Sequence, residues 1–383
     1  NTNGGGQHMS TKSKKFFLVD ELVTRANEAL PSELALTERT VRYYQSNNLI
    51  GKGLKISELP EEFGGAGGSL MMVAIAVEEL SKVDASASVV VSVNNSLVCW
   101  GLENFGTEEQ KQKYLVPLAT GEIIGAFCLS EPEAGSDATS QKTTAIDKGD
   151  HYLVNGTKNW ITNGNNASVY LVICQTNVEK GHKGINALIL EKDMEGFVVG
   201  PKENKLGIRG SDTHSLMFTD VKVPKENRIG DDGFGFTFAM KTLAGGRIGI
   251  AAQALGIASG AFELALQYSK ERKAFGKEIS KHQAIAFKLA DMATEIEVAR
   301  LLCLKAACDK DEKKDYTQSG AMAKLYAADM AMRNTVEAVQ IHGGYGFVKE
   351  FHVERLMRDA KITQIYEGTS EIQKIVISRS ILQ

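Results

Sequence analysis

The spacing of apolar residues changes twice along this chain, and this change restricts the folds that the chain can adopt. In the first third, apolar residues recur with a period near 3.6, which is typical of helices. Short β-branched and aromatic runs between turn residues follow, from about residue 125 to residue 235. The helical period then returns and continues to the end of the chain. The sequence therefore predicts a mixed, mostly α fold with a central β domain.

Turn and cap residues set the expected boundaries of the elements. Ser69 is a predicted N-cap for a helix from Leu70 to about Leu102. Asn155-Gly156 predicts a hairpin turn, because a two-residue turn of this hand needs positive φ at both positions. We expect strands at residues 123–129, 151–161, 168–175, 185–190 and 215–218, and long helices at residues 236–270, 282–310, 317–341 and 358–382.

These patterns divide the chain into five parts. The polar, Gly-rich start looks like the remnant of a tag and is left out of the predicted fold. The parts are residues 1–9, the tag remnant; 10–55, an atypical helical segment; 56–124, an N-terminal α domain; 125–235, the middle β domain; and 236–383, a C-terminal helical bundle.

Composition excludes several classes of protein. A length of 383 residues allows two or three domains and a large core. The net charge of −3 gives no general reason to bind nucleic acid, and no apolar run approaches the length of a membrane span, so neither DNA nor a membrane is an expected partner. The five cysteines lie mostly in apolar surroundings, as buried thiols do, which indicates a reducing compartment.

Sequence templates for several kinds of catalysis are missing. The seven histidines are scattered, and there is no HExxH or CxxC motif, so no metal site is expected. The G-x-S-x-G motif of hydrolases and the P-loop of nucleotide hydrolases are also missing. The glycine-rich stretches lie outside any strand–turn–helix unit, so a Rossmann dinucleotide site is not expected either.

Four segments carry candidate chemistry, and each also has an ordinary structural interpretation. Residues 127–137 form a strand and a turn rich in hydroxyls and carboxylates, which a capped turn would also explain. In residues 159–163 a Trp and a hydroxyl lie two apart on a strand and so face the same side, although Trp in a β domain is usually core. Residues 340–346 end a helix with glycines that either cap it or let a phosphate approach. In residues 358–373, Glu367 lies at a helix break, where burial would let it act as a base and exposure would leave it solvated.

Taken together and in this order, the four segments resemble the acyl-CoA dehydrogenase family, and most closely its short-chain (butyryl-CoA) branch. The resemblance runs from about Leu59 to Ile381. Supporting strings are PEEFGGAGG at 60–68, FGTEEQK at 105–111, NKLGIRGS at 204–211, GGRIG at 245–249 and ERKAFGK at 271–277. The resemblance implies the family fold, with an α domain, a β-barrel-like domain and a C-terminal four-helix bundle.

The resemblance also implies a reaction. Family members use FAD to oxidise an acyl-CoA thioester, here a short-chain one, to the trans-2-enoyl-CoA, and pass the electrons to an electron-transferring flavoprotein. Glu367 fills the base position of the family's Tyr-Glu-Gly-Thr motif and would remove the weakly acidic α-proton, while the β-hydride passes to flavin N5. The Glu367 backbone N–H and a ribityl hydroxyl of FAD would stabilise charge on the thioester oxygen.

Further residues are assigned to cofactor and substrate by the resemblance alone. Those that resemble the wall around the flavin ring are Phe127, Leu129, Ser130, Ser136, Trp160, Ile161 and Thr162. Those that resemble the site for the adenine and pyrophosphate of FAD, reached from a neighbouring subunit, are Arg272, Phe275, Gln283, Gln340, Gly343 and Gly344. Thr369 and Glu371 would lie at the cofactor edge, and the acyl-CoA contacts would be Ser136, Arg247, Tyr366 and Gly368. Sharing a cofactor between subunits implies an oligomer, expected to be a homotetramer.

Two features depart from the family pattern. Ala244 stands where relatives commonly carry Asp or Asn. Alanine has no polar side chain for the hydrogen bond that Asp or Asn would make on the substrate side. Residues 37–50 instead resemble the helix-into-wing segment of a MerR-type DNA-binding domain, in a slightly basic region. Either a DNA-binding module is fused to an enzyme, or divergent helices cover the active site.

Two other functions stay open at this point: an acyl-CoA-sensing DNA-binding regulator and an acyl-CoA oxidase. The expected location is cytoplasmic in a bacterium and the mitochondrial matrix in a eukaryote. The length and branching of the acyl group depend on the depth of a pocket that the sequence does not reveal.

Overall fold

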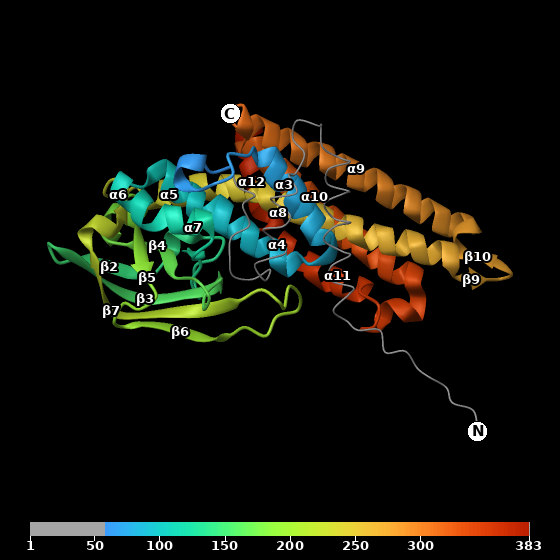
Figure 1. Cartoon of the computed structure of the whole chain (residues 1–383), viewed down its shortest axis with the longest axis horizontal. Helices are drawn as coiled ribbons and strands as arrows, with labels where there is room; N and C mark the ends of the chain where they lie inside the picture. Colours follow the sequence, from blue (N-terminus) through green and yellow to red (C-terminus); the bar gives the residue numbers. More distant parts are fainter. Residues whose placement is uncertain (1–57, 383) are drawn as a thin grey trace, which may run out of the picture. The chain divides into compact units, whose positions relative to one another are not determined.

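The computed structural model describes residues 58–382 of the chain (Figure 1). The expected tag remnant, the atypical helical segment at 10–55 and the MerR-like stretch at 37–50 lie outside the described residues. Within residues 58–382, helices come first, a sheet follows and helices complete the chain. The predicted mostly α fold with a central β region is confirmed.

The first helical region begins at the expected cap but is more broken than predicted. Ser69 Oγ accepts a hydrogen bond from Met72 N at 3.2 Å. The predicted continuous helix to Leu102 is wrong, because Asp84 is extended and its carboxylate accepts from Ser86 N, which starts a second helix. The elements are η2 (Glu61–Phe63), α3 (Leu70–Val83), α4 (Ala85–Ser92), the π-helical turn η3 (Val93–Cys99), α5 (Trp100–Phe105), α6 (Glu108–Gln110), the π-helical turn η4 (Lys111–Leu115) and α7 (Val116–Thr120).

The middle region is one mixed sheet with the strand order β6-β7-β3-β2-β4-β5-β8, and β1 pairs with β4 in parallel (Figure 1). Its strands are β1 (Gly125–Cys128), β2 (Thr144–Asp147), β3 (His151–Thr162), β4 (Val169–Gln175), β5 (Ile185–Glu191), β6 (Phe197–Lys202), β7 (Thr213–Pro224) and β8 (Arg228–Ile229). Short helical turns η5 (Ala138–Ser140), η6 (Val178–Gly184) and η7 (Lys225–Asn227) lie between them. The sequence does not predict β2, β6 or β8, because β2 and β8 are short and β6 contains Gly-Pro.

The predicted hairpin turn at Asn155-Gly156 is wrong, since both residues lie inside β3. Asn155 pairs with Thr144 of β2, and the register of β3 against β7 shifts between Val154 and Gly156. Gly156 has a φ of 145°, and a Cβ there would lie 2.6 Å from the Cα of Thr143. Glycine is needed for this close approach of two backbones rather than for a turn.

The C-terminal region packs long helices around α8. Its elements are α8 (Gly235–Glu271), β9 (Lys273–Ala274), β10 (Lys277–Glu278), η8 (Ile279–Lys281), α9 (Gln283–Asp311), α10 (Thr317–His342), η9 (Gly343–Phe347), α11 (Val353–Ala360), η10 (Lys361–Gln364) and α12 (Ser370–Ile381). Helix α10 contacts α8, α9 and α12, and α8 also contacts α3 (Figure 1). The predicted helix over 358–382 is divided into α11, η10 and α12.

A shared apolar core joins the helices to one face of the sheet. Leu97 of η3, Phe127 of β1 and Phe238 of α8 belong to it, and the rings of Phe127 and Phe238 are 6.3 Å apart. Leu129 and Tyr366 pack against the same core. The end of β1 and the turn before α12 therefore border the same core.

Two helical stretches, Ala85–Phe105 and Gly235–Glu271, are long and apolar enough to span a membrane, contrary to the expectation from sequence. Their most apolar windows are 72% and 83% buried inside the protein, as in core helices of a globular protein.

Candidate active site

Glu367 lies in the turn between η10 and α12, at the helix break that the sequence predicts. Its φ is 52°, and that of Gly368 is 90°. A glutamate in the left-handed region is strained, and such a conformation persists only where surrounding contacts impose it. The contacts that impose it come from α10 and α12.

Two side chains hold the Gly368 carbonyl. Lys324 Nζ on α10 donates to this oxygen at 2.6 Å, and Gln373 Nε2 on α12 donates to it at 2.8 Å. Both side chains are fully buried. Thr369 begins α12 by accepting a hydrogen bond from Ile372 N at 3.3 Å. The turn is therefore fixed immediately after Glu367.

The Glu367 carboxylate occupies a space left by a glycine of α8. A Cβ on Gly246 would lie 2.1 Å from Glu367 Oε2 and 2.7 Å from Leu97 Cδ2. Glu367 Oε2 is inaccessible to solvent and has no hydrogen-bond partner among residues 58–382. A buried carboxylate oxygen without a partner is costly, and such groups occur where a site needs a reactive base.

Burial dominates the electrostatics of this carboxylate. It raises the pKa of Glu367 to about 7, because the charged form loses its water, while the positive charges of Lys324 and Arg247 act in the opposite sense. A pKa near neutrality suits a group that must take up a proton and release it again.

Arg247 and Tyr366, both predicted to contact acyl-CoA, lie close to this carboxylate in the fold. Arg247 follows Gly246 on α8, is 6% exposed, and its Nε has no partner among the described residues. Tyr366 donates its hydroxyl to Gln253 Oε1, also on α8. The predicted contacts Arg247, Tyr366 and Gly368 thus gather around Glu367.

The two predicted flavin-wall segments meet through backbone and side-chain bonds. Asn159 N donates to the Ser130 carbonyl at 2.9 Å. Lys158 Nζ, fully buried, donates to the Leu129 carbonyl at 3.0 Å and to Glu131 Oε1 at 2.6 Å. Burial alone would raise the pKa of Glu131, but Lys158 and hydrogen bonds from the 142–143 backbone keep it below its usual value.

Trp160 is not a core residue, because 57% of it is exposed. It has a φ of 57° and lies in a second irregularity of β3, between Lys158 and Ile161. The sequence analysis expects Trp160 and Thr162 on the same face because side chains alternate along a regular strand. This bulge interrupts that alternation. Ile161 is 3% exposed and packs in a separate core within the sheet, so its side chain does not line an open site. An exposed indole beside this bulge is the kind of surface that a flat ring ligand covers.

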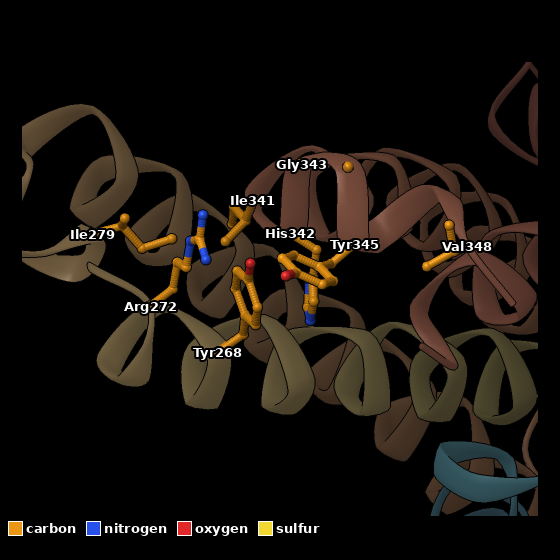
Figure 2. A pocket seen from close by; sticks show the side chains of 9 residues that line it. Tyr268, Arg272, Ile279, Ile341, His342, Gly343, Tyr345 and Val348 are labelled. Carbon is orange, nitrogen blue, oxygen red and sulfur yellow. The ribbon is translucent and has the colours of Figure 1, made fainter. Parts of the chain in front are cut away.

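A separate cavity of about 530 Å³ lies at the far ends of α8 and α10 (Figure 2). It is lined by Tyr268, Arg272, Ile279, Ile341, His342, Gly343, Gly344, Tyr345 and Val348. The Arg272 guanidinium lies 5.6 Å from the centre of the Tyr345 ring, and the rings of Tyr268 and His342 stack at 4.4 Å. Gly343 has a φ of 60°, and open space lies beside it and Gly344. A cation, aromatic rings and accessible backbone fit the adenine and pyrophosphate end of a dinucleotide.

This cavity is remote from Glu367 within one chain. Gly246 and Tyr268 are both on α8, and at 1.5 Å per residue they lie about 33 Å apart along the helix axis. That separation exceeds the reach of one FAD molecule. The structure therefore brings the predicted adenine-site residues together, but not at the Glu367 site of the same chain.

The other predicted site residues lie on the surface. Phe275 is 96% exposed at the turn between β9 and β10; Phe347, which is not a predicted site residue, is 87% exposed next to the cavity-lining Val348 in the sequence. Ser136, Gln283, Gln340 and Glu371 are also exposed. None of these four reaches the Glu367 carboxylate through a contact among the described residues.

Gly246, Lys324 and Gln373 have no assigned role in the sequence analysis. Of these three residues, Lys324 is the one whose importance the sequence pattern could have indicated most clearly. It is the one lysine on the buried face of α10, where its neighbours are small residues such as Gly320, Ala323 and Ala327. A charged residue on such a face points to a buried partner.

Neither a metal site nor a disulfide is found in the described residues. They contain no group of three His, Cys, Asp or Glu that could hold a metal ion. All five cysteines are free thiols; Cys308 is partly exposed and the other four are buried.

Comparison with known proteins gives matches along the chain. Residues 7–122, 126–221 and 233–382 match the N-terminal, middle and C-terminal domains of acyl-CoA dehydrogenases, and the first match includes the MerR-like stretch. The short-chain specific acyl-CoA dehydrogenase of Clostridium acetobutylicum is 55% identical over 84% of this chain and 85% of its own. Subunit CarC of the caffeyl-CoA reductase-Etf complex of Acetobacterium woodii is 48% identical over 86% of each chain. The structure of butyryl-CoA dehydrogenase from Megasphaera elsdenii superimposes with a TM-score of 0.87 at 47% identity, covering 99% of this chain and 100% of that one.

These matches confirm the resemblance found in the sequence, and no comparison supports a DNA-binding segment. The three domain matches follow the helical, β and helical regions of the structure in order, and Glu367 lies in the last of them. This chain belongs to the acyl-CoA dehydrogenase family.

Proposed function

We propose that this protein catalyses the FAD-dependent α,β-dehydrogenation of a short-chain acyl-CoA thioester, with Glu367 as the base. One observation carries the proposal. A buried, unpartnered carboxylate is held by a strained turn in the space beside Gly246, at the core that also receives Leu129 and Phe127. The relatives named for short-chain and butyryl-CoA substrates support the substrate class.

The chain's own groups account for removal of the α-proton. The Glu367 carboxylate accepts it, and the raised pKa makes the carboxylate a stronger base than an exposed glutamate. The Glu367 backbone N–H donates no hydrogen bond within residues 58–382, so it is free to bind the thioester oxygen. Arg247 would contact the acyl-CoA, and its buried Nε without a hydrogen-bond partner among the described residues supports this role.

The residues fit FAD in two groups. The hydroxyls of Ser130 and Thr162 and the exposed indole of Trp160 would surround the flavin ring. Arg272, Gly343 and Gly344 of a neighbouring subunit would bind the pyrophosphate, since their cavity is too far from Glu367 to serve the same chain. FAD supplies the two-electron oxidant. The protein would then be an obligate oligomer, and a homotetramer is the expected form.

The electron acceptor in this proposal is an electron-transferring flavoprotein. The CarC relative is named as a subunit of a reductase-Etf complex, which supports such a partner. The same name also favours a second candidate function, the reduction of a 2-enoyl-CoA. In that direction Glu367 would deliver the α-proton instead of removing it. The oxidase and the DNA-binding regulator are not favoured by these relatives.

Anaerobic titration of the flavin-loaded protein tests the proposal. Butyryl-CoA should bleach the flavin more completely than hexanoyl-, octanoyl- or isobutyryl-CoA. Glu367→Gln should keep the flavin and lose about 10²–10⁴-fold in turnover, as expected when a general base is removed. Glu337→Gln, on the surface of α10, is the matched control and should behave like the unmodified protein. Turnover above a tenth of normal in Glu367→Gln would overturn the assignment of the base.

The same assay identifies the electron acceptor and the direction of the reaction. Oxygen consumption without a flavoprotein partner would identify an oxidase. Faster turnover of crotonyl-CoA with reduced flavoprotein than of butyryl-CoA with oxidised flavoprotein would favour the reductive role.

A further inference from the structure

Lys324 is a buried lysine that the proposed reaction does not use. Its side chain is fully buried on α10, among small residues of the helix face packed against α8. Lysine is almost never fully buried unless its charge has a partner. Its one hydrogen bond among the described residues is to the carbonyl of Gly368, at 2.6 Å. The position therefore calls for a reason beyond packing.

The carbonyl that Lys324 holds belongs to the residue after the base. Gly368 and Glu367 both have positive φ, and no regular helix bond spans the turn that they form. Gln373 is the second donor to this oxygen and also reaches the Glu367 carbonyl at 3.2 Å. Without these donors the turn can relax toward negative φ, which would move the Glu367 side chain out of the space beside Gly246.

The charges around Lys324 come from several elements. Glu367 faces it from the turn and Arg247 from α8. Asp329 of its own helix and Glu371 of α12 complete the set of charged groups near it. Burial lowers the pKa of Lys324 to about 8, so the ammonium form still predominates at neutral pH. Its positive charge favours the ionised form of Glu367.

We propose that Lys324 is a positioning residue for the base: its ammonium group anchors the Gly368 carbonyl, which holds the Glu367 carboxylate in the space beside Gly246. The inference rests on the proposed function, in which Glu367 removes the proton. Lys324 does not touch the substrate in this scheme. It acts through the turn and through its charge.

Two substitutions separate these actions. Lys324→Met removes both the donor and the charge from a side chain of similar length. Gln373→Leu removes a donor to the same carbonyl but no charge. We expect Lys324→Met to lower kcat per bound flavin at least tenfold and to move the acid limb of kcat/KM to higher pH by about one unit or more, because an opposite charge near a carboxylate shifts its pKa by that amount. Gln373→Leu should lower kcat without moving the limb.

The measurement is the pH profile of kcat/KM with butyryl-CoA, together with the isotope effect of α-deuterated butyryl-CoA. A larger isotope effect in Lys324→Met would show that proton removal has become slower. Arg333→Met, which removes an exposed charge from the same helix, is the control and should change neither quantity. If Lys324→Met does not accumulate with flavin bound, Lys324→Gln, which keeps a donor but not the charge, takes its place in the same profile.

The inference fails if either Lys324 variant binds flavin normally and its acid limb stays within 0.3 pH units of the unmodified profile. Reduced yield with unchanged kcat per flavin would also overturn it, since that result shows a purely structural role. Failure of the proposed function is distinct, because it would appear as retained turnover in Glu367→Gln.

Discussion

Replacing Gly246 by alanine should separate activity from stability. The added Cβ would lie 2.1 Å from Glu367 Oε2, whereas ordinary contacts begin at 3.4 Å, so the carboxylate must retreat by about 1.3 Å. The atoms that must move are the ends of the Glu367 and Leu97 side chains, not backbone. Alanine in a helix interior is more favourable than glycine by roughly 0.5–1 kcal/mol. The fold should therefore lose little stability or gain some.

Catalysis should respond in the opposite way. A misplacement of about 1 Å of a reacting group can cost about 10²-fold in rate, so kcat per flavin in Gly246→Ala should fall by about this factor. The assay is kcat with butyryl-CoA at saturating acceptor, normalised to bound flavin, with thermal unfolding measured on the same sample.

Gly320→Ala on α10 is the matched control. A Cβ there would lie 3.5 Å from the nearest atoms, which is an ordinary contact, so activity should be unchanged and stability slightly higher. A Gly246→Ala enzyme with kcat within threefold of normal would refute the placement of the Glu367 carboxylate beside this glycine.

Two more predictions follow from groups described above. Burial raises the pKa of Glu367 to about 7, and the ionised form is the base in the proposed reaction. The value of kcat/KM should therefore rise about tenfold per pH unit below 7 and level off above it; a profile that levels off near pH 5 would contradict this. Lys158→Met should destabilise the protein by about 3–5 kcal/mol in urea unfolding, because it leaves Glu131 charged and buried without its cation. The double variant Lys158→Met with Glu131→Leu should recover most of the loss, and equal instability of both variants would argue against the ion pair as the cause.

Local sequence patterns were sufficient to predict the order of the regions. They also place Glu367 at a helix break between Tyr366 and Gly368, and the resemblance to the family's Tyr-Glu-Gly-Thr motif makes it the candidate base. Ser69 is an equally local signal, and its cap is confirmed. In both cases the residues that decide the structure lie within a few positions of one another.

Contacts between distant residues account for what the sequence could not reveal. Lys324 and its hydrogen-bond partner Gly368 are 44 residues apart in the sequence. Their contact depends on how α10 packs in the fold, which no local pattern predicts. Asn155-Gly156 misleads for the same reason, because a close approach to Thr143 of the preceding segment, not a turn, requires the glycine. The apolar period continues through Asp84 and therefore predicts one helix. The Asp84 side chain instead caps the start of a second helix, which divides the predicted one.

The exposed phenyl rings of Phe275 and Phe347 predict how the activity of the protein depends on its concentration. Rings that are 96% and 87% exposed in a single chain would be covered if a neighbouring subunit shares the dinucleotide. Separation of the subunits would then expose the rings to solvent and would also remove the protein contacts to the pyrophosphate of FAD. Specific activity should fall at nanomolar enzyme and return when FAD is added in excess, because mass action links assembly to retention of the cofactor.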